Sequence, residues 1–98
     1  MWRHGDVIIH EVQQIPSSAE KYPQSILVRG EVTGHAHRIA DPSSAVIWRT
    51  DGQLFLEVIA ESATITHEEH KPITLPRGTY QFWVQREYSP QAVRRVVD

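Results

Sequence analysis

The sequence contains no cysteine, and its single methionine is the first residue. Without cysteine there is no disulfide framework and no thiolate chemistry. A metal site would therefore need histidine or carboxylate ligands, and a nucleophile would have to be an oxygen. An excess of charge of one sign is also lacking, since 10 lysines and arginines are balanced by 12 aspartates and glutamates for a net charge of −2. This balance argues against a nucleic-acid-binding protein.

Long apolar runs are missing as well. No run approaches the roughly 18 residues that cross a bilayer, and the polar opening from Met1 to Asp6 differs from the apolar stretch of a signal peptide. We therefore expect a cytoplasmic protein with no membrane partner. Its 98 residues should form one domain over residues 1–98. The core of such a domain is thin, so a bound metal or a second subunit could add to its stability.

The apolar residues that are present favour β-structure. Valine and isoleucine together number 19, whereas leucine occurs 4 times, and β-branched side chains suit a pleated sheet better than a helix. We expect an all-β fold, a small barrel or sandwich of about seven short antiparallel strands. The strongest local signal is Asp51-Gly52 between two apolar runs at residues 45–50 and 53–59. Such a pair predicts a hairpin, because a type I′ turn needs two positive φ angles.

Further strands are expected at residues 6–13, 25–32, 61–66 and 79–88. Pro76-Arg77-Gly78 predicts a turn before the last of these. The segment from Ser89-Pro90 to Val97 is either a short helix or a final strand, and the strand is favoured because short isolated helices are weak. Trp83 lies on an otherwise polar face of strand 79–88. This placement predicts contact with another subunit and therefore a homo-oligomer.

Four of the six histidines form two close pairs. His35 and His37 would lie on the same face of an extended segment, where both rings could reach one ion at about 2.0–2.1 Å. Gly34 would let the backbone bend beside them. Taken alone, a pair with this spacing also occurs by chance on exposed strands.

The second pair is His67 and His70. Thr66 and Glu69 have the spacing of a capping box, and Lys71-Pro72 prevents continuation, so residues 67–70 are expected to form one helical turn. Residues three apart are neighbours in such a turn, although the same segment could be a solvated charged loop. His4 and His10 have no histidine at a useful spacing and are expected to lie outside any site.

Together the two pairs predict one metal site, most simply for zinc, because every candidate ligand is an imidazole. Three histidine ligands would leave a position for water and favour a hydratase or hydrolase that acts on a small electrophile. Glu68 and Glu69 would then be the catalytic carboxylates, as metal ligand, orienting group or proton shuttle. Four histidine ligands would instead close the site and make it structural. The alternative is a metal-free interaction module whose histidines titrate near neutral pH.

Three resemblances accompany these motifs. Segments 30–38, 66–70 and 85–88 resemble those of a set of short, largely uncharacterised bacterial proteins over nearly the whole chain, which implies no function. Residues 30–37 followed by Pro76-Arg77-Gly78 are similar to the cupin pattern of a glycine, a spacer, His-x-His and a later Pro-x-Gly. The His-x-His pair with a further histidine also resembles the zinc ligand set of α-type carbonic anhydrases, which implies hydratase (lyase) chemistry on zinc.

Overall fold

The computed structural model describes residues 1–29 and 35–85, and nearly all of its regular structure is strand. The strands are β1 Trp2–His4, β2 Val7–Val12, β3 Glu20–Tyr22, β4 Ile26–Arg29, β5 Ala36–Ile39, β6 Ala45–Thr50, β7 Gln53–His67 and β8 His70–Val84. One short 3-10 helix, Pro42–Ser44, precedes β6. The all-β prediction is confirmed. No helix in the described part of the chain is long and apolar enough to cross a membrane.

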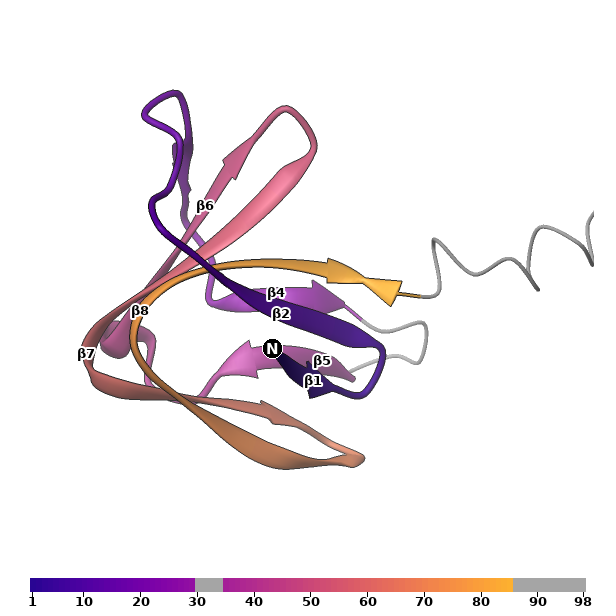
Figure 1. Ribbon diagram of the computed structural model, residues 1–98. Coiled ribbons are helices and arrows are strands. Elements are labelled where there is room, and N and C mark those ends of the chain that lie inside the picture. The colour runs from indigo at the N-terminus through magenta and orange to yellow at the C-terminus, as the bar shows by residue number, and fades with distance from the viewer. Residues whose placement is uncertain (30–34, 86–98) are drawn as a thin grey trace, which may run out of the picture.

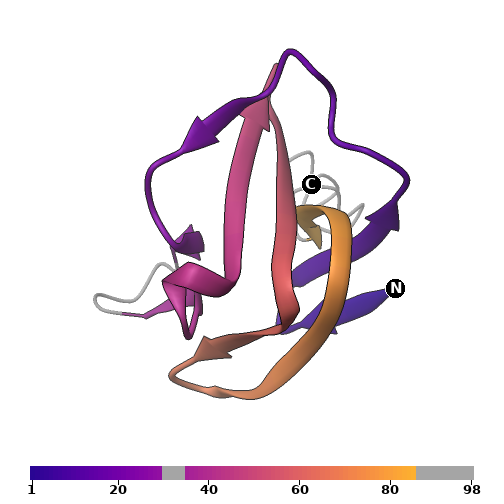
Figure 2. The ribbon, with the colours of Figure 1, turned by 90° about the vertical axis from the view of Figure 1, so that its left-hand side faces the viewer.

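The strands form one antiparallel sheet that curls into a half-barrel (Figures 1 and 2). The order along the sheet is β1-β2-β8-β7-β5-β4, and β6 with β3 forms a branch on β7. One edge of β7 pairs with β8 throughout, whereas the other edge pairs first with β6 and then with β5. The sheet therefore divides along β7, and its second half carries β5 beside the tip of the β7–β8 hairpin.

A bend in the long β7–β8 hairpin produces this division. The pairing passes from Val58↔Gly78 to Ser62↔Pro76. Between these two pairs, β7 therefore has more residues than β8. Such a bulge bends and twists the strand, and the Arg77 side chain donates from Nε to the carbonyl of Ala60 at 3.1 Å. The predicted turn at Pro76-Arg77-Gly78 is wrong. These residues lie inside β8, because the bulge accommodates the proline and the glycine without reversing the chain.

Two two-residue turns use glycine. At Asp51-Gly52 both φ angles are positive, 46° and 78°, and the predicted type I′ hairpin is confirmed. At Gly5-Asp6 only the glycine is positive, at 64°, which is the pattern of a type II′ turn. This turn joins β1 to β2. The strand expected at residues 6–13 is β2. The sequence did not lead us to predict β1 or the hairpin that β1 forms with β2.

The concave side of the half-barrel holds the core. Its largest fully buried side chains include Tyr80, Phe82, Ile9, Ile47 and Leu56. Towards the tip of the β7–β8 hairpin the core continues through Ile39, Ile65 and Leu75, each at most 3% exposed. The histidines described below begin where this apolar layer ends. The predictions for Gly34 and for the segment from Ser89-Pro90 to Val97 fall outside the described residues.

Candidate metal centre

Three segments that are far apart in the sequence meet at one end of the half-barrel. They are the β1–β2 turn, β5 and the β7–β8 turn, which lie on the same side of the molecule in Figure 1. The β7–β8 turn has Glu68 and Glu69 at its tip and pairs His67 with His70 across the hairpin. The predicted helical turn is wrong, because the antiparallel ladder continues to this pair. The two rings are neighbours through cross-strand pairing and not through helical spacing.

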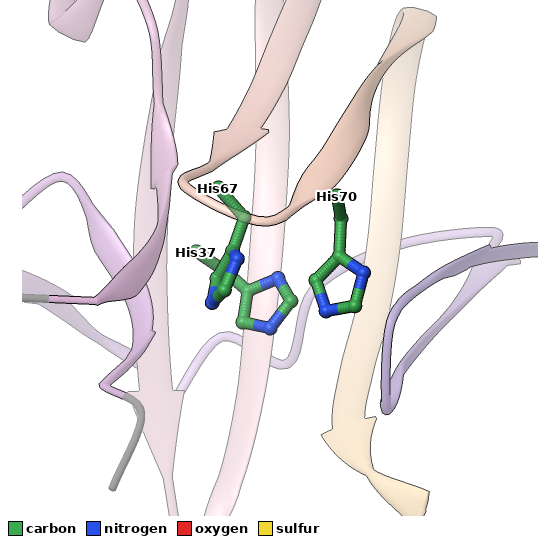
Figure 3. Close-up of side chains that lie close together, drawn as sticks. All are labelled: His37, His67 and His70. Carbon is green, nitrogen blue, oxygen red and sulfur yellow. The ribbon is translucent and has the colours of Figure 1, made fainter. Parts of the chain in front are cut away.

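His37 on β5 joins this pair. One ring nitrogen from each of His37, His67 and His70 lies within 4.8 Å of the others. The ring centroids are 4.4 Å apart for His37 and His67, 4.6 Å for His67 and His70, and 5.7 Å for His37 and His70. Figure 3 shows the three rings projecting into one space, two of them from the same turn. The structure thus brings together three of the four histidines that the sequence singled out.

His35 lies beside this group in a second one. Its ring is 5.7 Å from that of His67, and a nitrogen of each, with a carboxylate oxygen of Glu68, forms a set within 4.8 Å. His35 Nδ1 is also 3.7 Å from Glu69 Oε2. β5 begins only at Ala36, so the alternation of a strand does not extend to His35. The i, i+2 pair is therefore divided between two neighbouring groups that share His67.

His4 is the residue that the sequence reasoning missed. It is 2% exposed, and its Nδ1 lies 2.9 Å from His37 Nδ1. Its Nε2 is buried, and a hydrogen bond with the Lys71 backbone raises the pKa of the ring against the effect of burial. A signal was present, because Gly-Asp after a short extended run predicts a hairpin turn. Placing the first strand at Asp6 concealed that turn and left His4 outside the site.

The β1–β2 turn encloses the polar edge of the His37 ring. His4 contacts Nδ1, and Asp6 Oδ1 lies 3.4 Å from Nε2. Between them, a Cβ on Gly5 would come within 3.1 Å of His37 Cε1 and 2.6 Å of His70 Nε2. Glycine is favoured here by its φ of 64°, and a side chain would also press on the buried His37 ring and displace the exposed ring of His70. Three consecutive residues thus surround the atoms through which His37 would bind a ligand.

The buried rings are uncharged near neutral pH. Burial lowers the pKa of His37 to about 4, the neighbouring His4 and His67 add to that effect, and Asp6 opposes it. Burial also lowers the pKa of His4, and proximity to His70 and His67 acts in the same direction. Neutral imidazole is the form that binds a metal ion. Burial therefore holds His37 in the form that can bind a metal ion.

Metal binding by His67 would require a change in the hydrogen bonding of its ring. Its Nδ1 accepts a hydrogen bond from the backbone N–H of Glu69 at 3.0 Å, so in this arrangement the ring proton belongs on Nε2. Coordination through Nε2 would require that proton to move to Nδ1 and the bond from Glu69 to break. Coordination through Nδ1 would displace the same N–H. Metal binding at His67 therefore has to change the environment of the Glu69 amide.

The two glutamates have unlike surroundings. Glu68 Oε1 accepts the Ala36 backbone N–H at 3.0 Å, and Oε2 lies 3.4 Å from Arg38 Nη1. The bond from Ala36 is the main reason that the pKa of Glu68 is lowered. Glu68 thus connects the β7–β8 turn to β5, whereas the Glu69 side chain is 68% exposed. His10 is exposed on β2, where it pairs with Gln81.

Comparison with known proteins gives a family but no activity. Neither the curated proteins nor the solved structures contain a match to this chain. A family model described as a domain of unknown function, DUF8820, matches residues 3–85, which include all the histidines of both groups and His4. The expected resemblance to an uncharacterised family is confirmed at this level. The chain belongs to the family described as domain of unknown function DUF8820.

Proposed function

We propose that this protein binds a first-row divalent metal ion, zinc before others, through His37, His67 and His70. The observation that carries the proposal is the convergence of three imidazole nitrogens within 4.8 Å of one another. Imidazole suits zinc and its neighbours in the series, whereas calcium and magnesium prefer oxygen ligands. No cysteine competes for the ion.

Two further features support metal binding. The rings project from a β-hairpin and a paired strand, so that their positions are fixed by backbone hydrogen bonds. Burial keeps His37 neutral, so binding at pH 7 would release no proton from that ring. The backbone of the site is thus built before the ion binds, and the main local change that binding requires is at His67, whose Nδ1 accepts the Glu69 N–H.

The proposed reaction class follows from the number of histidine ligands. A zinc ion held by three imidazoles keeps one position for water and lowers its pKa to about 7, as needed for hydration or hydrolysis of a small electrophile. Hydration of carbon dioxide is the simplest such reaction and agrees with the resemblance to the ligand set of α-type carbonic anhydrases. Glu68 belongs to the second group with His35 and His67, and its carboxylate could orient a ligand there.

A metal-free interaction module is the second candidate. Its support is that a ring nitrogen of His37 is hydrogen bonded to His4 and one of His67 to the Glu69 amide, so protein groups occupy both nitrogens. The prediction of a homo-oligomer belongs here too. Trp83 is half-buried and lines an apolar groove of about 580 Å³ with Phe82 and Leu27. Light scattering at several concentrations measures the mass, and a constant value near 11.3 kDa would contradict an oligomer.

Metal content separates the two candidates. Protein purified without a histidine tag should contain close to one zinc per chain by elemental analysis. After chelation, it should bind zinc again in a calorimetric titration. His70→Ala should lose this binding, whereas His10→Ala, the same change at an exposed position outside the cluster, should keep it. Circular dichroism checks that both variants retain the β-sheet.

The Glu69 amide gives an independent measurement. In the ¹H–¹⁵N spectrum its resonance should move on adding zinc, because the bond to His67 Nδ1 has to change. Absence of zinc from the purified protein, together with no heat in the titration and an unmoved Glu69 resonance, would overturn the metal proposal in favour of the interaction module.

A further inference from the structure

We propose that His4 is a positioning residue that selects Nε2 of His37 as the atom that binds the ion, an inference that rests on the metal binding proposed above. The Nδ1 atoms of the two rings are 2.9 Å apart, which is a hydrogen-bond length. Two nitrogens that are each about 2.0–2.1 Å from one tetrahedral ion would be about 3.3–3.4 Å apart. The two Nδ1 atoms are therefore partners in a hydrogen bond and not joint ligands.

The other contact of the His4 ring decides which of the two rings donates. Both rings are buried, at 2% and 3% exposure, and burial keeps them neutral, so each has a single N–H. The hydrogen bond with the Lys71 backbone raises the pKa of His4. Only an acceptor stabilises the charged ring in this way, so the partner is the Lys71 carbonyl and His4 is the donor. Since Nδ1 faces His37, His4 donates from Nε2.

The tautomer of His37 follows from that of His4. With its only N–H directed to Lys71, His4 has a lone pair on Nδ1 and accepts the Nδ1–H of His37. The lone pair of His37 is then on Nε2. Asp6 Oδ1 lies beside this nitrogen at 3.4 Å, longer than the 2.7–3.2 Å of an N–H···O hydrogen bond. The shorter contact with His4 therefore determines the position of the proton.

This arrangement prepares His37 for the ion before the ion arrives. Binding through Nε2 breaks no hydrogen bond and moves no proton within the ring, whereas His67 has to exchange its bond with the Glu69 amide. Outer hydrogen-bond partners fix the tautomer and orientation of metal-binding histidines in this way. Here the partner comes from β1 and is itself held by the backbone of β8, so both strands hold the ligand on β5.

The first test needs no substitution. In metal-free wild-type protein labelled with ¹⁵N in its histidines, spectra that correlate ring carbon protons with ring nitrogens distinguish a protonated nitrogen from one with a lone pair. The proton should be on Nδ1 in His37 and on Nε2 in His4. The same protein is then loaded with ¹¹³Cd²⁺, whose nuclear spin couples to the nitrogen that binds it, and the coupling in His37 should be to Nε2.

A pair of variants separates positioning from packing. His4→Phe keeps a buried ring but removes the acceptor, while Asp6 remains beside the other nitrogen of His37. The His37 proton should therefore move to Nε2, and zinc affinity, measured by competition with a chelator, should fall about 10–100-fold. Lys71→Ala is the control, because it removes an exposed side chain next to His70 and keeps the backbone carbonyl. It should retain the wild-type tautomer and affinity.

Three results would overturn the inference and leave the three-histidine site standing. They are a wild-type His37 protonated on Nε2, cadmium coupling to its Nδ1, and reduced affinity in His4→Phe with the His37 proton still on Nδ1. Wild-type protein that binds neither cadmium nor zinc would overturn the metal proposal and this inference with it. The two failures are distinguishable, because the tautomers are measured without metal.

Discussion

The turns at Gly5-Asp6 and Asp51-Gly52 reverse the chain with two residues each, but their surroundings differ. A Cβ on Gly52 would meet no atom within 4 Å, whereas one on Gly5 would lie 2.6 Å from His70 Nε2. The glycine at the solvent turn satisfies a backbone angle only. Gly5, at the histidine turn, satisfies both a backbone angle and the packing of the site. Glycine therefore has one function at Asp51-Gly52 and two at Gly5-Asp6.

Alanine at each glycine should separate these functions. Gly52→Ala should cost about 1–2 kcal/mol, the strain of a left-handed residue. Gly5→Ala adds about 1–3 kcal/mol of overpacking against the rings, and zinc binding should be lost with it. Urea unfolding in the presence of a chelator gives both stabilities. Equal losses in the two variants would show that the histidine turn is no more tightly packed than the other.

Acid should weaken the histidine end of the molecule first. Without metal, the pKa of His37 is about 4 in the fold and about 6.5 in the unfolded chain. The unfolded chain therefore takes up more protons between these values, and stability falls as the pH drops from 6.5 to 4. Over this whole pH interval the free energy of unfolding falls by about 3 kcal/mol.

The titratable groups that face His37 are His4, Asp6, His67 and His70. Urea midpoints between pH 7.5 and 4.5 measure the loss, and His37→Gln should reduce the slope. Hydrogen exchange should show that amides of the β1–β2 turn lose protection before those around Asp51-Gly52. Simultaneous loss at both turns would contradict the assignment to His37.

Replacing His4 tests its role beside the ring. His4→Phe preserves a buried ring but leaves His37 Nδ1 without its partner, which should cost about 1–3 kcal/mol. Zinc affinity should fall about 10–100-fold. His10→Phe makes the same change at an exposed site on β2 and should leave affinity unchanged. Equal zinc affinity in His4→Phe and wild type would show that His4 does not position His37.

The smallest effect is expected at Glu68. Glu68→Gln retains an acceptor for the Ala36 N–H but loses the ion pair with Arg38, and such surface pairs contribute little to stability. Zinc affinity should change less than in His4→Phe. A large loss of carbon dioxide hydration with unchanged zinc content would instead support the catalytic role predicted for this residue.

The sequence predicted well what depends on local chemistry. β-branched composition indicated the fold class, and Asp51-Gly52 indicated a hairpin, because both signals act through backbone preferences of neighbouring residues. His37, His67 and His70 were identified for the same reason, as close pairs on short segments. Their convergence depended on the correct conclusion that rings three residues apart are neighbours, although the hairpin and not a helix makes them so.

What failed depended on distant partners. Pro76-Arg77-Gly78 has turn composition, but the bulge in β7 opposite it decides that the strand continues. His4 has no histidine near it in sequence and becomes part of the cluster only because the opening hairpin packs against β5 and the β7–β8 tip. Pairings across more than 30 residues leave no periodic trace in one sequence.

The pairing of Val7 with Val84 has a consequence for how the molecule is made. Ribosomes add about 5–20 residues per second, so the first hairpin waits on the order of 4–15 seconds for the strand beside which it must lie. Contacts of such long range also form slowly. His4 and Asp6 reach His37 and His70 only after the end of β8 has been synthesised. A nascent chain therefore has an incomplete histidine cluster, and if the cluster binds an ion as proposed, tight retention of that ion would distinguish finished chains from partial ones.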